Sequence, residues 1–278
     1  MSTTNAAEMA SLKDKLKATW MAGNYDYFSR FMESSAVEFL DRLPLRAGDR
    51  LLDVACGSGQ LALLAARRGA EATGVDIATN WIDAARGRAA SEGLAARFDE
   101  GDAEELPYPD ESFDVVASVY GAMFAPRPER VAQELARVCR SGGTIAMANW
   151  NKDGFVGRMF QIFGRFIAPS GMPSPLLWGD ESTVRQRFGD AVAKLRLTRA
   201  QCRFDYPFPP ERVVDFFRDH YGPAHRAFAT LSDTDRLALR DALIDLWSGA
   251  NQSRSPGRTV VSAEYLEVVA TRANRRSQ

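Results

Sequence analysis

Residues 51–62 read LLDVACGSGQLA and decide the fold. An apolar run leads directly into a glycine-rich turn and then into residues with helical spacing. Gly57 permits a tight turn, Gly59 lets a ligand approach the backbone, and Ala62 allows close packing of a helix on a strand. Many nucleotide-binding α/β folds use this strand–turn–helix pattern, although a single Gly-x-Gly-x-x-Ala match also arises by coincidence.

The same alternation of apolar runs and helical stretches continues on the C-terminal side. We expect strands at 50–56, 71–77, 96–102, 113–120 and 144–150, and helices at 60–68, 79–92 and 129–140. Ser141-Gly142-Gly143 is expected to form a turn before the fifth strand. Strands that alternate with helices predict right-handed crossovers and a mostly parallel sheet with helices on both faces.

Both flanks of this region are expected to be largely helical. Helices are predicted at 8–20, 27–43, 151–167 and 181–188 and within 209–250, and strands at 194–206 and 258–271. We therefore divide the chain into an N-terminal helical extension, an α/β core, a helical insertion and a tail. These are residues 1–43, residues 44–208 with 251–273, residues 209–250, and residues 274–278.

Composition excludes several classes of protein. The chain has 278 residues, which fits one elaborated α/β domain, and its 45% apolar and 26% charged residues are ordinary for a soluble globular protein. A net charge of -1 gives no basic excess for a nucleic-acid backbone. The cysteines Cys56, Cys139 and Cys202 are far apart and predict reduced thiols in a cytoplasmic protein. We expect no export signal, membrane span or metal site.

Asp76 ends the second expected strand, where a carboxylate accepts hydrogen bonds from ribose hydroxyls. The alternative is that Asp76 caps the following helix. Asp53 lies four residues before Gly57, where it would repel the pyrophosphate of a dinucleotide and attract an ammonium group. S-adenosylmethionine has a ribose, an adenine and an ammonium group but no phosphate. Asp53 could instead hold loop amides in place.

Four segments carry a resemblance to a known family. DVACGSG, GVDI, GDAEELPYPDESFDVV and RVCRSGG, in this order, resemble the class I S-adenosylmethionine-dependent methyltransferases. They are most similar to the branch that includes ubiquinone- and menaquinone-biosynthesis C-methyltransferases and many small-molecule O- and N-methyltransferases. The resemblance covers about residues 45–150. It implies a Rossmann-like α/β fold with seven strands in the order 3-2-1-4-5-7-6, the last one antiparallel, beneath a helical cap.

The resemblance also implies a set of cofactor contacts. The expected cofactor-binding residues are Asp53, Ala55, Gly57 and Gly59 around the methionine moiety, Asp76 at the ribose, Ile77 and Trp81 beside the adenine, Asp102 and Ala103 at the adenine amino group, Ser118 and Val119 facing the acceptor, and Tyr25 closing over the cofactor. Many relatives have a His-rich stretch after the fourth strand. Here residues 120–124 read YGAMF, so no base is assigned there.

The sequence offers two candidates for a catalytic group. His220 and His225 are the two histidines of the chain, and His220 and Tyr25 are candidates for a catalytic role, although histidines on a helix are commonly structural. The expected reaction is in-line transfer of a methyl group to an O, N or C atom of a small, partly apolar or aromatic acceptor. Two alternatives stay open: a nicotinamide-dependent oxidoreductase and a non-catalytic S-adenosylmethionine-binding protein. Neither a nucleic-acid nor a membrane partner is expected, and the oligomeric state is undetermined.

Overall fold

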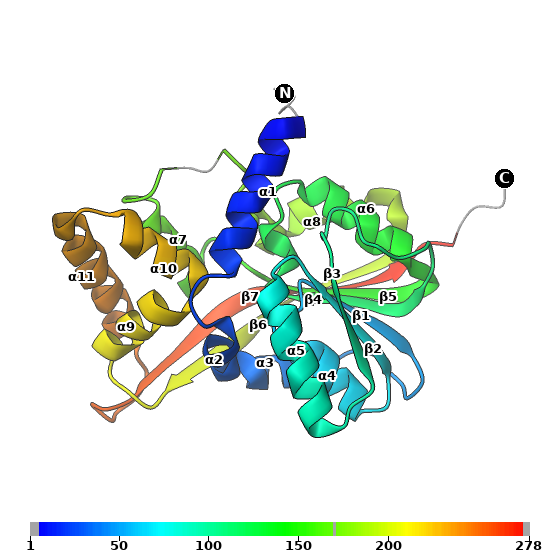
Figure 1. Cartoon of the computed structure of the whole chain (residues 1–278), viewed down its shortest axis with the longest axis horizontal. Coiled ribbons are helices and arrows are strands. Elements are labelled where there is room, and N and C mark those ends of the chain that lie inside the picture. Colours follow the sequence, from blue (N-terminus) through cyan, green and yellow to red (C-terminus); the bar gives the residue numbers. More distant parts are fainter. Residues whose placement is uncertain (1–5, 169–170, 275–278) are drawn as a thin grey trace.

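A twisted sheet in the order β3-β2-β1-β4-β5-β7-β6 runs through the centre of the protein (Figure 1). The structure is a computed structural model that describes residues 6–168 and 171–274. Its strands are β1 (Arg50–Val54), β2 (Glu71–Asp76), β3 (Ala96–Glu100), β4 (Phe113–Val119), β5 (Cys139–Trp150), β6 (Val192–Tyr206) and β7 (Thr259–Arg272). Strands β1 to β5 pair in parallel, and β7 is antiparallel to both of its neighbours. The expected Rossmann-like sheet is confirmed.

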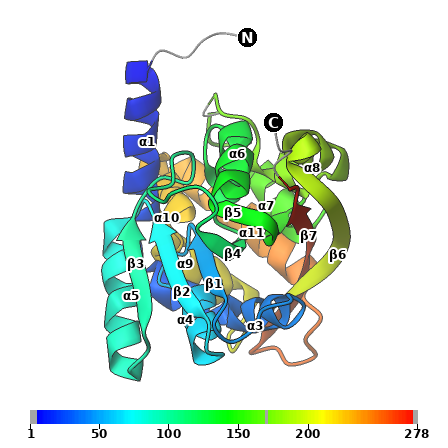
Figure 2. The ribbon, with the colours of Figure 1, turned by 90° about the vertical axis from the view of Figure 1, so that its right-hand side faces the viewer.

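Helices cover the two faces and one end of the sheet. The α-helices are α1 (Ala6–Trp20), α2 (Tyr25–Ser29), α3 (Glu33–Asp41), α4 (Gln60–Arg67), α5 (Thr79–Glu92), α6 (Pro128–Val138), α7 (Phe155–Phe163), α8 (Glu181–Phe188), α9 (Pro210–His220), α10 (Gly222–Thr230) and α11 (Asp233–Ala250). Helices α3 and α4 lie on one face, α6 and α8 lie on the other, and α5 runs along the β2–β3 edge (Figure 2). Helix α1 stands across the carboxyl ends of the strands.

The strand register brings the ends of β1 and β4 together. Asp53 on β1 pairs with Gly74 on β2 and with Ala117 on β4. The residues that follow these strands therefore meet at one edge of the sheet. In open parallel sheets this edge, where the strand order reverses, forms the ligand-binding crevice. Strands β1 and β4 and the second half of β5, from Ile145 to Trp150, are almost fully buried, so the crevice lies on the core of the sheet.

The prediction of a turn at Ser141-Gly142-Gly143 is wrong. These residues lie inside β5, which begins at Cys139 and pairs with Phe113 before the register shifts. Val115 then pairs with Thr144, so the intervening residues of β5 bulge out of the ladder. A bulge keeps a strand continuous while it bends it, and it uses the same glycine-rich residues that make turns.

Two expected helices are shorter or broken. The 27–43 stretch forms most of α2, the 3-10 turn η1 (Arg30–Met32) and α3. Within it, Phe28 packs against Tyr221 and Phe31 packs against Tyr206. The 151–167 stretch is helical only within α7. Its start is delayed because the side chain of Asn151 accepts a hydrogen bond from the N–H of Gly154 at 2.6 Å, which holds a local turn.

The helical insertion leaves the sheet and returns to it at adjacent positions. Tyr206, the last residue of β6, pairs with Thr259, the first residue of β7, so α9, α10 and α11 form a side loop of the β6–β7 pair. No helix in the described ranges is long and apolar enough to cross a membrane. Most of the predicted tail, residues 275–278, lies outside the described residues.

Candidate cofactor and acceptor site

The crevice begins where β1 and β4 end. Ala55, just after β1, and Tyr120, just after β4, both have positive φ angles, of 58° and 56°. Such angles are costly for residues with a side chain and cluster at functional sites. The two turns touch, because a Cβ on Gly121 would lie 2.5 Å from the carbonyl oxygen of Ala55. Gly121 thus lets the two strained turns approach each other.

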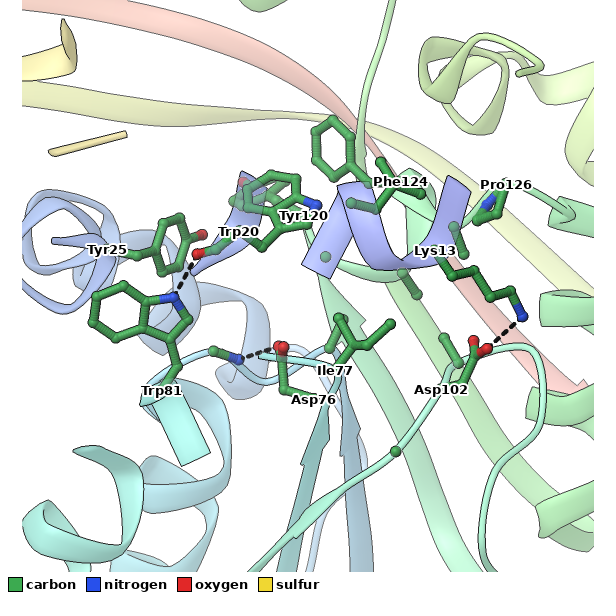
Figure 3. A pocket seen from close by; sticks show the side chains of 18 residues that line it. Lys13, Trp20, Tyr25, Asp76, Ile77, Trp81, Asp102, Tyr120, Phe124 and Pro126 are labelled. Carbon is green, nitrogen blue, oxygen red and sulfur yellow. Dashed lines mark hydrogen bonds and ion pairs between the residues drawn. The ribbon is translucent and has the colours of Figure 1, made fainter. Parts of the chain in front are cut away.

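A cavity of about 770 Å³, counting its solvent-open part, lies above this point (Figure 3). Its size is within the range of ligand pockets in proteins. It is lined by Lys13, Leu16, Trp20, Tyr25, Ala55, Gly57, Asp76, Ile77, Trp81, Gly101, Asp102, Ala103, Tyr120, Gly121, Ala122, Phe124, Ala125 and Pro126. The structure therefore brings together most of the predicted residues, from four different strand ends.

Asp76 presents its carboxylate to the glycine turn. It accepts hydrogen bonds from the N–H groups of Gly57 and Ala78, both at 2.8 Å. Burial raises its pKa, whereas these backbone N–H groups act to lower it. Ala78 is the N-cap residue of α5, so Asp76 stabilises the local turn and also faces the cavity. A structural role for Asp76 at the start of α5 and a role in binding a ribose are therefore compatible.

Asp53 lies deeper, in a second cavity of about 440 Å³ behind the turn. Its carboxyl group accepts a hydrogen bond from the N–H of Ala62 at 3.2 Å. Burial, and to a smaller extent the charge of Asp76, raises the pKa of Asp53 to about 8, although the Ala62 N–H opposes this shift. A cationic group beside Asp53 would favour its ionised form.

Tyr25 closes the glycine turn from the N-terminal side. A Cβ on Gly57 would lie 3.2 Å from its ring, so the ring rests directly on the turn. Burial and the nearby carboxylates of Asp76 and Asp53 raise the pKa of Tyr25 well above its usual range. The hydroxyl group therefore stays protonated at neutral pH and can donate a hydrogen bond but cannot serve as a base.

Helix α1 is held over the end of the cavity where Asp102 lies by ion pairs and a hydrogen bond. Lys13 forms ion pairs with Asp102 and with the buried Glu104, as Figure 3 shows for the first of these. Lys17 pairs with Glu100 at the end of β3. At the other end of α1, the indole N–H of Trp81 donates a hydrogen bond of 2.7 Å to the carbonyl oxygen of Trp20. Asp102 is thus already engaged by α1.

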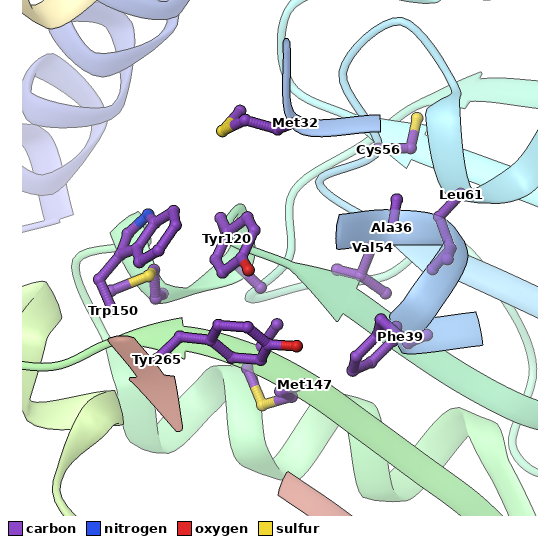
Figure 4. Packing of buried hydrophobic residues seen from close by; sticks show 14 of the residues in the cluster. Met32, Ala36, Phe39, Val54, Cys56, Leu61, Tyr120, Met147, Trp150 and Tyr265 are labelled. Atoms are coloured by element: carbon purple, nitrogen blue, oxygen red, sulfur yellow. The ribbon is translucent and has the colours of Figure 1, made fainter. Parts of the chain in front are cut away.

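A third cavity, of about 360 Å³, is almost entirely aromatic. It is lined by Trp20, Tyr25, Phe28, Met32, Tyr120, Phe124, Trp150, Val156, Met159, Phe204, Phe217 and Tyr221. Tyr25 and Tyr120 line all three cavities and mark their common boundary. The Tyr120 ring stacks on Trp150 with centroids 3.8 Å apart (Figure 4). The Tyr120 hydroxyl group forms a hydrogen bond of 2.8 Å with the hydroxyl group of Ser35.

Three predicted site residues lie elsewhere. Gly59 lines none of these cavities, because its Cα faces Phe98, whose ring a Cβ would meet at 2.7 Å. Ser118 also lines none of them: its hydroxyl group donates to the carbonyl oxygen of Val54 and accepts from the N–H of Ala122. These contacts make Ser118 a connection between two turns. Among the expected residues, Val119 does line the second cavity.

His220 is the third predicted site residue that lies elsewhere. Its ring packs against Tyr27 and Phe216, and it lines none of the three cavities that the described residues form. The structure therefore does not bring His220 together with the other predicted site residues. Phe216 also packs among aromatic residues outside these cavities, whereas Phe217 and Tyr221 line the third one.

Several lining residues were not predicted. Lys13, Leu16 and Trp20 come from α1, and Tyr120 and Phe124 come from the segment after β4. Two signals were available: an aromatic residue directly after a buried strand, and a tryptophan at the end of an N-terminal helix. Neither signal shows which face of α1 covers the sheet.

The donor set of the site fits S-adenosylmethionine. The glycine turn carries buried carboxyl groups on both sides, from Asp53 and Asp76, and Lys13 is the one cation among the described residues that line the first two cavities. Lys13 lies at Asp102, away from the turn. The turn therefore offers a pyrophosphate no positive charge from the described lining side chains, whereas an ammonium group and ribose hydroxyls suit the two carboxyl groups. Strand order and site together define the class I S-adenosylmethionine-dependent methyltransferases.

Comparison with known proteins supports the assignment to this class of methyltransferases. Residues 52–147 match the family model of the methyltransferase domain. An uncharacterized protein of Mycobacterium tuberculosis, Rv1405c, is 36% identical over 276 residues, which covers 96% of this chain and 97% of that protein. The 27-O-demethylrifamycin SV methyltransferase of Amycolatopsis mediterranei is 38% identical over 135 residues, 46% of this chain and 50% of that protein. The chain belongs to this methyltransferase family, and its cofactor is S-adenosylmethionine.

The fold also matches solved structures. A phosphoethanolamine N-methyltransferase of Haemonchus contortus, solved with S-adenosylhomocysteine, superposes with a TM-score of 0.56 over 87% of this chain and 53% of that one, at 18% identity. At this identity the likeness concerns the fold. The family assignment excludes the nicotinamide-dependent oxidoreductase that the sequence alone left open. Within residues 6–168 and 171–274, no group of three or more His, Cys, Asp or Glu residues could hold a metal ion.

Proposed function

We propose that this methyltransferase transfers the methyl group to an O, N or C atom of a small, partly apolar or aromatic acceptor held in the aromatic cavity. The observation that carries the proposal is the shared boundary of the cavities. Tyr25 and Tyr120 face both the cofactor crevice and the aromatic cavity, so a ligand in each would meet at these two rings. Aromatic walls favour a planar or apolar acceptor.

For the cofactor, we infer the following contacts from the lining of the first two cavities. Asp76 would bind the ribose hydroxyls, Ile77 and Trp81 would flank the adenine, and Ala103 would offer its backbone N–H to it. Asp102 would accept from the adenine amino group, which requires it to exchange or share its ion pair with Lys13. Asp53, Ala55, Gly57 and Val119 would surround the methionine moiety, beneath the ring of Tyr25.

Methyl transfer from this cofactor requires little covalent chemistry from the protein. The sulfonium of S-adenosylmethionine supplies an electrophilic methyl group, which an acceptor atom attacks directly. The protein contributes orientation and the exclusion of water, which account for large rate effects. No Asp, Glu, His, Lys or Arg is among the described residues that line the aromatic cavity. Burial also raises the pKa of Tyr221, so its hydroxyl group stays protonated. Orientation rather than proton removal by the cavity walls is therefore the proposed basis of catalysis.

We also propose that different segments of the chain carry catalysis and acceptor selection. Residues 44–208 and 251–273 would form the catalytic core, and residues 1–43 and 209–250 would form a cap that selects the acceptor. Trp20, Tyr25 and Phe28 come from the first cap segment, and Phe217 and Tyr221 come from the second. A ubiquinone- or menaquinone-type C-methyltransferase activity, a cytoplasmic location and the absence of nucleic-acid and membrane partners stay predictions.

The experiment that tests the proposal is an assay of methyl transfer. The purified protein is incubated with S-adenosylmethionine labelled in its methyl group and with a panel of phenols, quinols, macrolide alcohols and amines. Labelled product from a small, neutral aromatic acceptor, such as a phenol or a quinol, is expected. Binding of the cofactor without transfer to any member of the panel would favour the non-catalytic alternative.

A further inference from the structure

Three tyrosine hydroxyl groups belong to the walls of the aromatic cavity, and they differ in what they bind. The hydroxyl group of Tyr120 forms a hydrogen bond with that of Ser35. Those of Tyr25 and Tyr221 form no hydrogen bond with any group in residues 6–168 and 171–274. Neither is sealed inside the protein, because the fully buried polar atoms that lack a partner in these ranges do not include them. A ligand in the cavity can therefore reach both hydroxyl groups.

Tyr25 differs from Tyr221 in its place in the site. Tyr25 lines all three cavities, whereas Tyr221 lines the aromatic cavity alone among the three. The ring of Tyr25 lies on the glycine turn, since a Cβ on Gly57 would be 3.2 Å from it. The same ring packs against Trp20 and Phe28, with centroids 6.2 Å and 5.6 Å apart. Packing therefore fixes this hydroxyl group at the boundary between the cofactor crevice and the aromatic cavity.

The hydroxyl group of Tyr25 is a hydrogen-bond donor at neutral pH. Burial, together with the carboxyl groups of Asp76 and Asp53, raises its pKa well above the usual range. A protonated phenol that donates to an oxyanion favours the ionised form of the group it binds. Asp76 opposes an anion nearby, but two backbone N–H groups already share its charge. Burial raises the pKa of Asp53 to about 8, so this carboxyl group is largely neutral at about pH 7.

The walls of the cavity limit the acceptors that suit this donor. No charged side chain is among the described residues that line it, so an oxyanion would find no cation in the walls. Its partner charge is the positive charge of the cofactor. Methyl transfer to an oxyanion neutralises both charges, which an apolar cavity favours because it stabilises isolated charges poorly. An amine acceptor gains no such advantage, because the positive charge then moves onto the amine.

We propose that the hydroxyl group of Tyr25 donates a hydrogen bond to the oxygen atom of a phenolic acceptor that receives the methyl group. The assignment rests on the proposed acceptor site in the aromatic cavity. The phenol loses its proton to water before it is enclosed. Its oxygen then forms a bond to the methyl carbon as the C–S bond breaks, with the electron pair of that bond left on sulfur. The products are a methyl ether and S-adenosylhomocysteine.

Two probes that differ at one position test this contact. 4-Nitrophenol carries a hydroxyl group, and 4-nitrotoluene has a methyl group in its place. Sinefungin serves as the cofactor analogue, because it has a cationic amine and no methyl group to transfer. With sinefungin present, Tyr25→Phe is expected to weaken 4-nitrophenol binding about 10-fold or more in calorimetry, the size of a hydrogen bond to a charged group. Binding of 4-nitrotoluene should change less than about 2-fold, because the aromatic ring is kept.

The absorbance of 4-nitrophenol gives a second measurement, because its ionised and neutral forms absorb at different wavelengths. The bound probe should be ionised in wild type and less ionised in Tyr25→Phe, since the variant lacks the donor. Tyr27→Phe is the matched control, because Tyr27 is exposed and lines none of the three cavities that the described residues form. This control should leave the affinities and the absorbance unchanged.

The other outcomes separate the contact from the site on which it rests. Equal losses for the two probes in Tyr25→Phe, or no loss for either, would overturn the assignment. A loss confined to sinefungin would show that the hydroxyl group serves the cofactor and would overturn it as well. Wild-type protein that binds neither probe would instead contradict the proposed acceptor site in the aromatic cavity.

Discussion

The cofactor crevice and the aromatic cavity meet at Tyr25 and Tyr120 but are built in different ways. The polar groups of the crevice follow consecutive strands of the sheet, so most of them fall within residues 53–103. The walls of the aromatic cavity extend from Trp20 to Tyr221 and come from α1, α2, η1, β5, α7, β6, α9 and the segments after β4 and α9. Local motifs therefore specify the crevice, and long-range packing specifies the cavity.

The two regions also differ in what they contribute to the stability of the fold. In the crevice, buried carboxyl groups accept hydrogen bonds from backbone N–H groups and line cavities, and these bonds offset the cost of burying them only in part. In the aromatic cavity, Phe28, Phe217 and Tyr221 contact one another and are all buried, so the walls also serve as core. Substitutions should consequently affect binding in the first region, and stability together with turnover in the second.

The largest effect is expected in the aromatic cavity. Phe217→Ala should lower the free energy of unfolding by about 3–5 kcal/mol, because it removes a large buried ring and leaves a void. Turnover should fall or the acceptor preference should change, whereas the Kd for S-adenosylhomocysteine should stay within about 3-fold. Thermal denaturation, calorimetry and the methyl-transfer assay measure the three quantities.

Phe217→Leu and Tyr221→Phe serve as milder companions, because each keeps most of the buried volume. A change in acceptor preference should persist in Phe217→Leu. If both milder variants methylate every acceptor as wild type does, the cavity is core alone and the proposed acceptor site is wrong.

An intermediate effect is expected at Asp53, and it should depend on pH. The pKa of Asp53 is about 8 in the folded protein and near 4 in the unfolded chain, so folding favours the protonated form. Its stabilising contribution is full below about pH 4 and is lost as the pH rises toward 8. Asp53→Asn cannot ionise, and its amide oxygen can still accept from Ala62.

The advantage in stability of Asp53→Asn over wild type should therefore grow from near zero at about pH 4 to a few kcal/mol at about pH 8. Urea unfolding at several pH values measures it, with Asp83→Asn on the exposed face of α5 as the control. A difference that stays constant across this range would contradict the buried, protonated state of Asp53.

The smallest effect on stability, and the clearest on binding, is expected at Asp76. Asp76→Ala should weaken S-adenosylhomocysteine binding by about 1.5–3 kcal/mol, the value of charge-assisted hydrogen bonds to ribose hydroxyls. The protein should stay folded, although the N–H groups of Gly57 and Ala78 lose an acceptor. Calorimetry gives the affinity and circular dichroism checks the fold. If a folded Asp76→Ala variant binds S-adenosylhomocysteine as tightly as wild type, Asp76 only stabilises the start of α5.

Prediction from sequence succeeded where a contact is short in sequence or where a pattern repeats. The helix Thr79–Glu92 and the helix Glu181–Phe188 have the boundaries that were expected, and Asp53, Gly57 and Asp76 gather at one crevice. It failed where one residue type serves two purposes. Gly59 was expected to admit a ligand but instead makes room for Phe98, and the glycines after Cys139 form a bulge rather than a turn.

The sequence by itself determined the class of fold, the cofactor and the order of the polar residues along the crevice. These depend on strand periodicity, on glycine conformation and on charge, which act within a few residues of each other. Only the tertiary structure decided that α1 is fastened over the crevice by Lys13, that Tyr120 separates the cavities, and that His220 lies outside them. Those arrangements result from packing between segments up to two hundred residues apart, and apolar side chains have no directional preference that would mark their partners in advance.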